Sequence, residues 1–179
     1  MEINNWFKKN HLTFDENITA YTLNNSTLFN KRWQRFIAMY FPNAIVRKKF
    51  WQLTCVEIGE GSFLNPNVTV VDDYNSGECL LAIGNNCSIA PGVVFAAHSS
   101  HNNSKILRTE GLLKDLEKRE KIIIGDDVWV GANATIGAGV TIGRCSIIGA
   151  NTYVNKNIPD YSLAYGVPVK IIKDLRSLV

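Results

Sequence analysis

Three histidines are the residues of this chain best suited to accept a proton at neutral pH. A histidine with the usual pKa of about 6.5 changes charge close to neutrality and can act as a general base. His11 lies in an N-terminal segment with no partner visible in the sequence, His98 falls in the run FAAHSS, and His101 follows three residues later. An isolated histidine is more often structural than catalytic, so position alone leaves both roles open for His98.

The four cysteines form no recognisable metal or redox motif. They lie at positions 55, 79, 87 and 145, and no pair has the CxxC spacing of a zinc or thiol–disulfide site. We interpret all four as packing residues in a reducing compartment. The sequence therefore predicts no bound metal.

Length and composition indicate one globular domain. The chain has 179 residues, of which 46% are hydrophobic and 20% charged. A net charge of +3 is too small to indicate nucleic acid as a partner. The apolar runs are too short for a membrane span, and residues 1–4 do not resemble the start of a signal peptide. We expect a cytoplasmic protein without a nucleic-acid partner.

A six-residue repeat over residues 124–154 predicts the framework that must position any site. A period of six matches neither the helical period of 3.6 nor simple strand alternation, and it is typical of a parallel β-helix. Gly follows most of the repeated aliphatic residues, and the same register recurs over residues 58–70 and 83–95. An ordinary β-sandwich is disfavoured by this unbroken spacing. The repeated aliphatic positions of the main block are Ile124, Val130, Ile136, Ile142, Ile148 and Val154.

The segments outside the repeat suggest the domain organisation. Residues 1–52 carry no repeat and contain an amphipathic helical pattern, so we expect a small helical N-terminal cap over the open end of the β-helix. Residues 53–168 form the β-helix, which a protruding excursion loop at residues 99–121 interrupts. Residues 169–179 form a C-terminal tail. Long excursions from a solenoid often carry function, although this one could be a tolerated insertion.

The segment Arg47 to Trp51 is both basic and aromatic. It could contact a membrane surface or an anionic substrate. We favour a structural interpretation, in which it is a cap helix whose aromatic side chains pack and whose cations face water.

Four stretches together resemble a known family. They are NPNVTVVDD (65–73), IGNNCSIAPGVVFAAH (83–98), IGDDVWVGANATIGAGVTIG (124–143) and IGANTYVNKNIPDYSLAYGVPVKIIK (148–173). They resemble the hexapeptide-repeat acyltransferases, and within them the galactoside and maltose O-acetyltransferase branch. The resemblance implies a mainly β fold, the left-handed parallel β-helix. It also implies a homotrimer with its sites in the clefts between subunits.

The resemblance implies direct transfer of an acetyl group from acetyl-CoA to a hydroxyl of a saccharide or related small molecule, without an acyl-enzyme. His98 matches the family's catalytic histidine, which removes the hydroxyl proton. Asn65 and Asp73 match positions that contact the acceptor, and Trp129 matches a tryptophan that lines the site. The other reading of Asn65 and Asp73 is turn formation, and that of Trp129 is packing on a neighbouring subunit.

Six further positions match the donor side of the family's site. Two are small residues where the pantetheine arm lies, and four lie near the CoA nucleotide. The family often has Arg at the last two of these, where Lys retains the charge but loses the bidentate fork. The six are Ala132, Ala150, Asn155, Lys156, Lys170 and Lys173.

Two other functions share this fold. A β-helix zinc carbonic anhydrase needs three histidines around one metal, and only His98 and His101 lie near the coils here. A non-catalytic scaffold would bind no acetyl-CoA. The cap and the excursion after His98 depart from the galactoside and maltose pattern, so the acceptor stays open, as does the choice between O- and N-acetylation.

Overall fold

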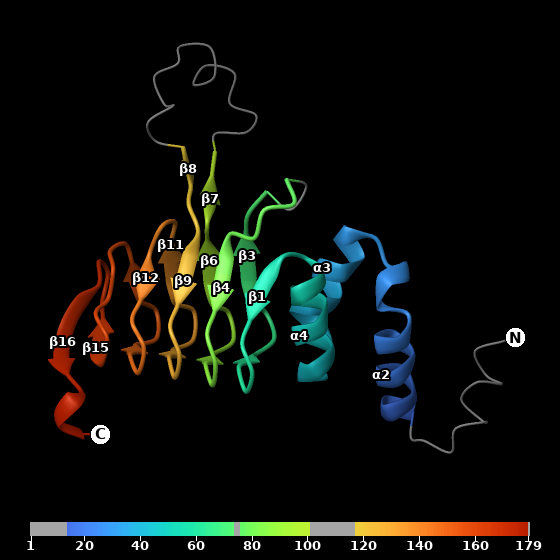
Figure 1. The fold of residues 1–179 in the computed structure, drawn as a ribbon, viewed down its shortest axis with the longest axis horizontal. Coiled ribbons are helices and arrows are strands. Elements are labelled where there is room, and N and C mark those ends of the chain that lie inside the picture. Colours follow the sequence, from blue (N-terminus) through green and yellow to red (C-terminus); the bar gives the residue numbers. More distant parts are fainter. Residues whose placement is uncertain (1–13, 74–75, 101–116, 179) are drawn as a thin grey trace, which may run out of the picture.

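The computed structural model describes residues 14–73, 76–100 and 117–178. Three sheets form the walls of a prism, and each coil of the chain contributes one strand to each wall in turn (Figure 1). Their strands are parallel except for the last strand of one sheet. Sheet A contains β1 (Val56–Ile58), β4 (Leu81–Ile83), β9 (Ile122–Ile124) and β12 (Thr141–Ile142). Sheet B contains β2 (Phe63–Leu64), β5 (Ser88–Ile89), β10 (Trp129–Val130), β13 (Ile147–Ile148), β15 (Ser162–Tyr165) and β16 (Lys170–Asp174). Sheet C contains β3 (Thr69–Val71), β6 (Val94–Ala96), β11 (Thr135–Gly137) and β14 (Tyr153–Val154).

The repeated aliphatic residues fill the interior of the prism. In sheet C, Ile136 pairs in register with Phe95 on one side and Val154 on the other, and all three side chains are fully buried. In sheet B, Val130 is stacked in the same way between Ile89 and Ile148. Each such side chain contributes about 1.5–3 kcal/mol by leaving water. The predicted mainly β fold, a parallel β-helix, is confirmed.

The turns between strands depend on residues with left-handed backbone angles and on glycines that allow close packing of coils. Left-handed backbone angles fall on several non-glycine residues, such as Asp127 (φ 55°) and Asn151 (φ 54°), and on some glycines, such as Gly92 (φ 74°). Gly131 has another role, because a Cβ at that position would lie 2.5 Å from the backbone nitrogen of Ala150 in the next coil. The repeated glycine therefore permits close stacking of coils at the corners.

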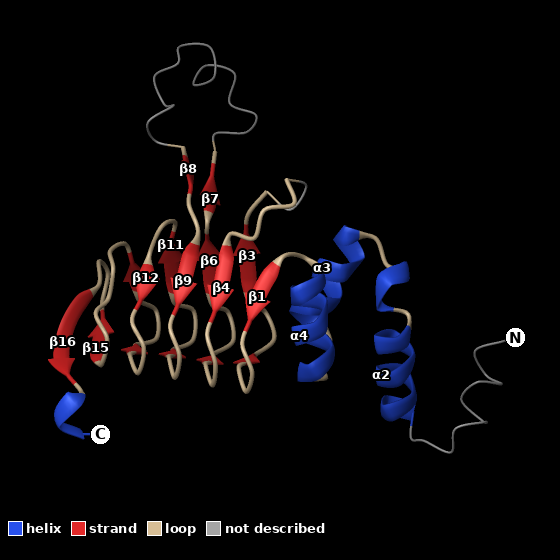
Figure 2. Cartoon of the chain, in the orientation of Figure 1, coloured by secondary structure: helices blue, strands red, loops and turns tan. Residues whose placement is uncertain are grey.

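Helices cover the N-terminal end of the prism. They are α2 (Phe14–Asn24), the 3₁₀ turn η1 (Ser26–Leu28), α3 (Lys31–Tyr40) and α4 (Ala44–Leu53). Asn30 caps α3 by accepting a hydrogen bond from the backbone N–H of Trp33 at 3.1 Å. Phe50 and Trp51 of α4 are fully buried, and α4 lies over the first coil (Figure 2). The open end of the core is thereby shielded from water.

The basic aromatic segment lies within α4. Its aromatic residues pack as expected, but the expectation that its cations face water is wrong for Arg47, which is 2% exposed. The Arg47 guanidinium donates to the carbonyl oxygens of Phe41, Pro42 and Leu64. Burial lowers the pKa of this guanidinium. Main-chain carbonyls of the cap and of the first coil thus attract the cation inward.

Two short strands begin and end the excursion. β7 (His98–Ser99) pairs antiparallel with β8 (Lys118–Arg119), and this ribbon projects from the prism (Figure 1). Most of the predicted excursion loop, together with His101, lies outside the described residues, as does His11. At the other end of the prism, β16 pairs antiparallel with β15 and leads into the 3₁₀ turn η3 (Arg176–Leu178).

Within the described ranges, no helix has the length and apolar character needed to cross a membrane.

Candidate active site

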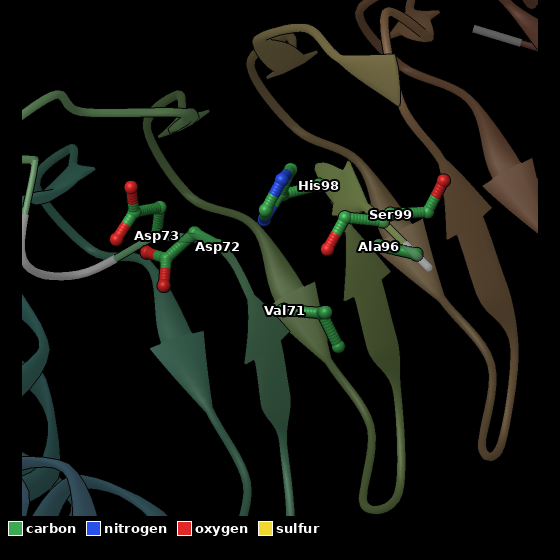
Figure 3. Close-up of a pocket in the computed structure, with 7 residues that line it drawn as sticks. Val71, Asp72, Asp73, Ala96, His98 and Ser99 are labelled. Carbon is green, nitrogen blue, oxygen red and sulfur yellow. The ribbon is translucent and has the colours of Figure 1, made fainter. Parts of the chain in front are cut away.

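A hollow lies where two strands of sheet C end side by side. β3 and β6 pair in register, Val71 beside Ala96, so the residues that follow them emerge at the same corner of adjacent coils. The hollow has a volume of about 630 Å³. Its lining residues are Val71, Asp72, Asp73, Ala96, His98, Ser99 and Ser100. Figure 3 shows both aspartates to one side of His98.

The ribbon at the base of the excursion holds His98. Its backbone pairs with that of Arg119, and its side chain is half-buried at the rim of the hollow. Backbone pairing fixes the direction of the Cα–Cβ bond of His98, and its side chain lines the open hollow. The hexad pattern breaks at this residue, so the sequence indicates the position of the histidine but not the ribbon that orients it.

Asp73 lies next to a cation that the sequence did not single out. Nη1 of Arg119 is 4.0 Å from Oδ2 of Asp73, and its Nη2 is 3.0 Å from Oε2 of Glu78. These side chains are partly exposed, so the pairs add little stability. They bring a guanidinium to the rim of the hollow. Arg119 follows a stretch without repeat, which is why periodicity gives no signal for it.

The other aspartate of the hollow has a different environment. The Asp72 side chain is 3% exposed and forms an ion pair with Arg35 of α3. Arg35 lies in the N-terminal segment whose amphipathic pattern predicts a helix, and that pattern gives it no specific role. No local pattern connects positions 35 and 72, and only the folding of the cap onto the first coil brings them together.

Asn65 is not part of this hollow. It follows β2 at the corner between sheets B and C, whereas Asp73 and His98 follow strands of sheet C at the opposite corner. The Asn65 side-chain amide donates to the carbonyl oxygen of Ile89 at 3.0 Å. Within one chain, the predicted acceptor residues are therefore divided between two corners of the prism.

Trp129 also lies away from His98. It points outward from the middle of sheet B, between Ser88 and Ile147 on the neighbouring strands, and is 55% exposed. Phe63, two strands along the same face, is 45% exposed. Large aromatic side chains on a flat face are typical of a contact surface.

The two small residues predicted for the donor side stack at the Asn65 corner. Ala132 follows β10 and Ala150 follows β13, and the N–H of Asn151 donates to the carbonyl oxygen of Ala132 at 2.9 Å. Neither side chain extends beyond Cβ. This corner therefore leaves room for a slender molecule along the coils.

The four predicted nucleotide-contacting residues are all exposed, in two groups. Asn155 and Lys156 follow β14, at the same corner as His98 but two coils further along. Lys170 and Lys173 lie on β16, at the C-terminal end of sheet B. Their positive charge is available to an anion at the surface. The residues predicted to contact acetyl-CoA thus lie at both corners of sheet C and on β16 of sheet B.

The chemistry available in the hollow is that of an imidazole and a carboxylate. The imidazole can take a proton from a hydroxyl, and the carboxylate can accept a hydrogen bond from another hydroxyl. Among residues 14–73, 76–100 and 117–178, no three His, Cys, Asp or Glu side chains are grouped so that they could hold a metal ion. The buried Cys87 thiol has a raised pKa because of desolvation and belongs to the core.

Comparisons with known proteins agree with this architecture. Residues 121–156 match the family model for the bacterial transferase hexapeptide (six repeats). A galactoside O-acetyltransferase from Escherichia coli (strain K12) is 38% identical over 122 residues, which are 67% of this chain and 54% of that protein. A solved galactoside acetyltransferase in complex with coenzyme A is 27% identical, with a TM-score of 0.61, over 83% of this chain and 80% of that one.

A hexapeptide-repeat acetyltransferase from Vibrio cholerae, solved with acetyl coenzyme A, has a TM-score of 0.64 over 82% of this chain and 85% of its own. Its 24% identity supports the fold alone. Together these matches confirm the left-handed parallel β-helix and the predicted resemblance to hexapeptide-repeat acyltransferases of the galactoside and maltose O-acetyltransferase branch. The chain spans about half the length of the galactoside O-acetyltransferases that it matches: 54% of the Escherichia coli protein and 51% of one from Lactococcus lactis.

Proposed function

We propose that this protein is an acetyl-CoA-dependent O-acetyltransferase that acts on a hydroxyl of a saccharide or a related small molecule. The observation that carries the proposal is the shared hollow of His98 and Asp73, at the break in a hexapeptide β-helix. Similarity to galactoside O-acetyltransferases supports the reaction and the class of acceptor.

In the proposed reaction, an imidazole nitrogen of His98 takes the proton of the acceptor hydroxyl as its oxygen attacks the thioester carbonyl of acetyl-CoA. The resulting tetrahedral intermediate breaks its carbon–sulfur bond, which releases the acetyl ester and CoA. The thiolate of CoA recovers the proton from the imidazolium. Base assistance of this kind contributes about 10²–10⁴-fold in rate, and alignment of the two substrates provides much of the rest.

Asp73 has the second role in the hollow. Its carboxylate accepts a hydrogen bond from another hydroxyl of the acceptor and so orients the reacting one. The Arg119 guanidinium lies 4.0 Å from this carboxylate and brings a positive charge to the same rim of the hollow.

We assign the donor to the surface along the coils. The small side chains of Ala132 and Ala150 leave room for the pantetheine arm. The exposed Asn155, Lys156, Lys170 and Lys173 lie near the nucleotide, where lysines attract its phosphates.

The separation of the site residues supports a homotrimer. Asn65 and Trp129 lie at one corner and face of the prism, and His98 and Asp73 lie at another. A cyclic trimer brings a neighbour's sheet B against the His98 corner and covers the exposed Trp129. Each active site is then shared between two chains.

The test is CoA release from acetyl-CoA, followed with a thiol reagent across a panel of galactosides, maltose, other sugars and hydroxylated antibiotics. Acceptor-dependent release by the wild type should fall about 10²–10⁴-fold in His98→Ala. The variant must keep the wild-type oligomeric state and CoA affinity. Release that does not depend on His98 contradicts the mechanism. No release and no binding of acetyl-CoA would favour a scaffold instead.

A further inference from the structure

Arg35 of α3 reaches the strand that ends at the hollow. Its Nη1 donates to the carbonyl oxygen of Val70 at 2.9 Å. Its Nη2 donates to both carboxylate oxygens of Asp72, at 2.5 and 2.6 Å. One guanidinium of the cap thus holds the main chain and a side chain at the end of β3. Residues of two different parts of the fold, the helical cap and the first coil, meet here.

This contact is largely withdrawn from water. The side chain of Arg35 is 15% exposed and that of Asp72 is 3% exposed. The guanidinium carbon lies 5.9 Å from the ring centroid of the fully buried Trp51. A buried ion pair fixes its two partners because removing either one leaves the other charge without compensation. The end of β3 is therefore held more firmly than an exposed turn would be.

Helix α3 also holds the beginning of the same strand. The N–H of Asn67, two residues before β3, donates to the carbonyl oxygen of Met39 at 2.8 Å. The cap thus contacts β3 at both ends. The exposed face of α3 does not take part in these contacts, and Arg32 on that face is a suitable reference position.

We propose that Arg35 is a positioning residue for the acceptor, acting through Asp72. Asp72 is joined directly to Asp73, and both line the hollow with His98 (Figure 3). Holding Asp72 against the cap leaves Asp73 as the carboxylate that meets the acceptor, at a fixed position relative to the imidazole. This role rests on the proposed function of the hollow. It gives the N-terminal cap a part in acceptor binding in addition to covering the core.

The first test is kinetic and uses the panel acceptor with the highest wild-type activity. Arg35→Gln and Asp72→Asn should each raise the KM for that acceptor about 10–10²-fold, because small displacements of a site residue have effects of this size. Affinity for CoA, measured by calorimetry, should stay within about twofold of wild type. The double variant should be no worse than the more affected single variant, since both remove one interaction. Arg32→Gln should leave all constants unchanged.

Arg35→Lys keeps the charge but loses the two-pronged contact, so it should give an intermediate KM even if Arg35→Gln folds poorly. Hydrogen–deuterium exchange supplies a readout that is independent of activity. Residues 69–73 should exchange faster in Arg35→Gln than in Arg32→Gln, while the coils of residues 124–154 stay protected.

Unchanged exchange in residues 69–73, or equal losses of acceptor and CoA binding, would overturn the positioning role. Absence of acetyl transfer by the wild type would overturn the proposed function, and the acceptor role of Arg35 with it. An active wild type whose acceptor KM is unaffected by Arg35→Gln would overturn the positioning role alone.

Discussion

The regular coils and the corner where Asp73 and His98 lie, called the His98 corner, are built from the same strands but present different side chains. In the coils, each strand directs one aliphatic side chain into the prism, and stacked copies such as Phe95, Ile136 and Val154 form a dry core. At the corner, β3 and β6 run into segments that leave the repeat and present Asp73 and His98 to solvent. The coils supply a rigid frame, and the proposed active site lies where the frame is interrupted.

The two regions also differ in what holds them. The coils are held by neighbours one coil away, through hydrogen bonds such as that from Gly131 N–H to the carbonyl oxygen of Ile148 at 2.8 Å. The corner is held by distant parts of the chain, through Arg35 of the cap and Arg119 of the excursion. Changes in the coils should therefore act on stability, and changes at the corner on catalysis.

The largest effect on stability is expected inside the coils. Ile136→Ala removes a fully buried side chain between Phe95 and Val154, and it should lower the free energy of unfolding by about 2–5 kcal/mol. Thr135→Ala, on the outward side of the same strand, is the control and should change it by less than about 1 kcal/mol. Denaturant unfolding measures both. Equal losses in the two variants would contradict the stacked core.

At the corner, Asp73→Asn removes the charge that we propose orients the acceptor. A hydrogen bond to a charged group contributes about 1.5–3 kcal/mol, so kcat/KM for the acceptor should fall about 10–10²-fold with little change in thermal stability. Glu78→Gln is the control, because Glu78 contacts the same Arg119 but does not line the hollow. A loss of stability without a loss of activity would show that Asp73 has a structural role and does not bind the acceptor.

A smaller effect is expected at the far end of sheet B. Lys173→Ala should raise the KM for acetyl-CoA by about threefold to tenfold, and more at low salt, because an exposed cation gives a screened attraction to phosphates. Lys49→Ala, an exposed lysine on the cap, should leave it unchanged. If both variants behave alike, the lysines of β16 take no part in nucleotide binding.

Sequence periodicity was sufficient to predict the β-helix because its core positions recur every six residues. The same periodicity predicts which residue of Trp129 and Val130 points inward, and the structure agrees. His98 could be singled out because it matches the catalytic histidine of the family that the sequence resembles, whereas its position alone left its role open. Arg35 and Arg119 could not, since their contacts join segments with no shared pattern.

One expectation about the cap was wrong. The basic segment of α4 was expected to expose its cations, but Arg47 is buried against main-chain carbonyls of the cap and of the first coil. Sequence alone does not show where unpaired carbonyl groups will gather. Likewise, it did not show that Asn65 and His98 occupy different corners of one chain, which leads to the shared site proposed above.

The most direct test of that shared site is subunit complementation. His98→Ala and Trp129→Ala chains, each with a different affinity tag, are coexpressed, and mixed trimers are purified on both tags in succession. If each site takes His98 from one chain and Trp129 from its neighbour, every mixed trimer contains one intact site of three, and activity should be about a third of wild type. Mixed trimers no more active than the two parents would show that the site is not shared in this way.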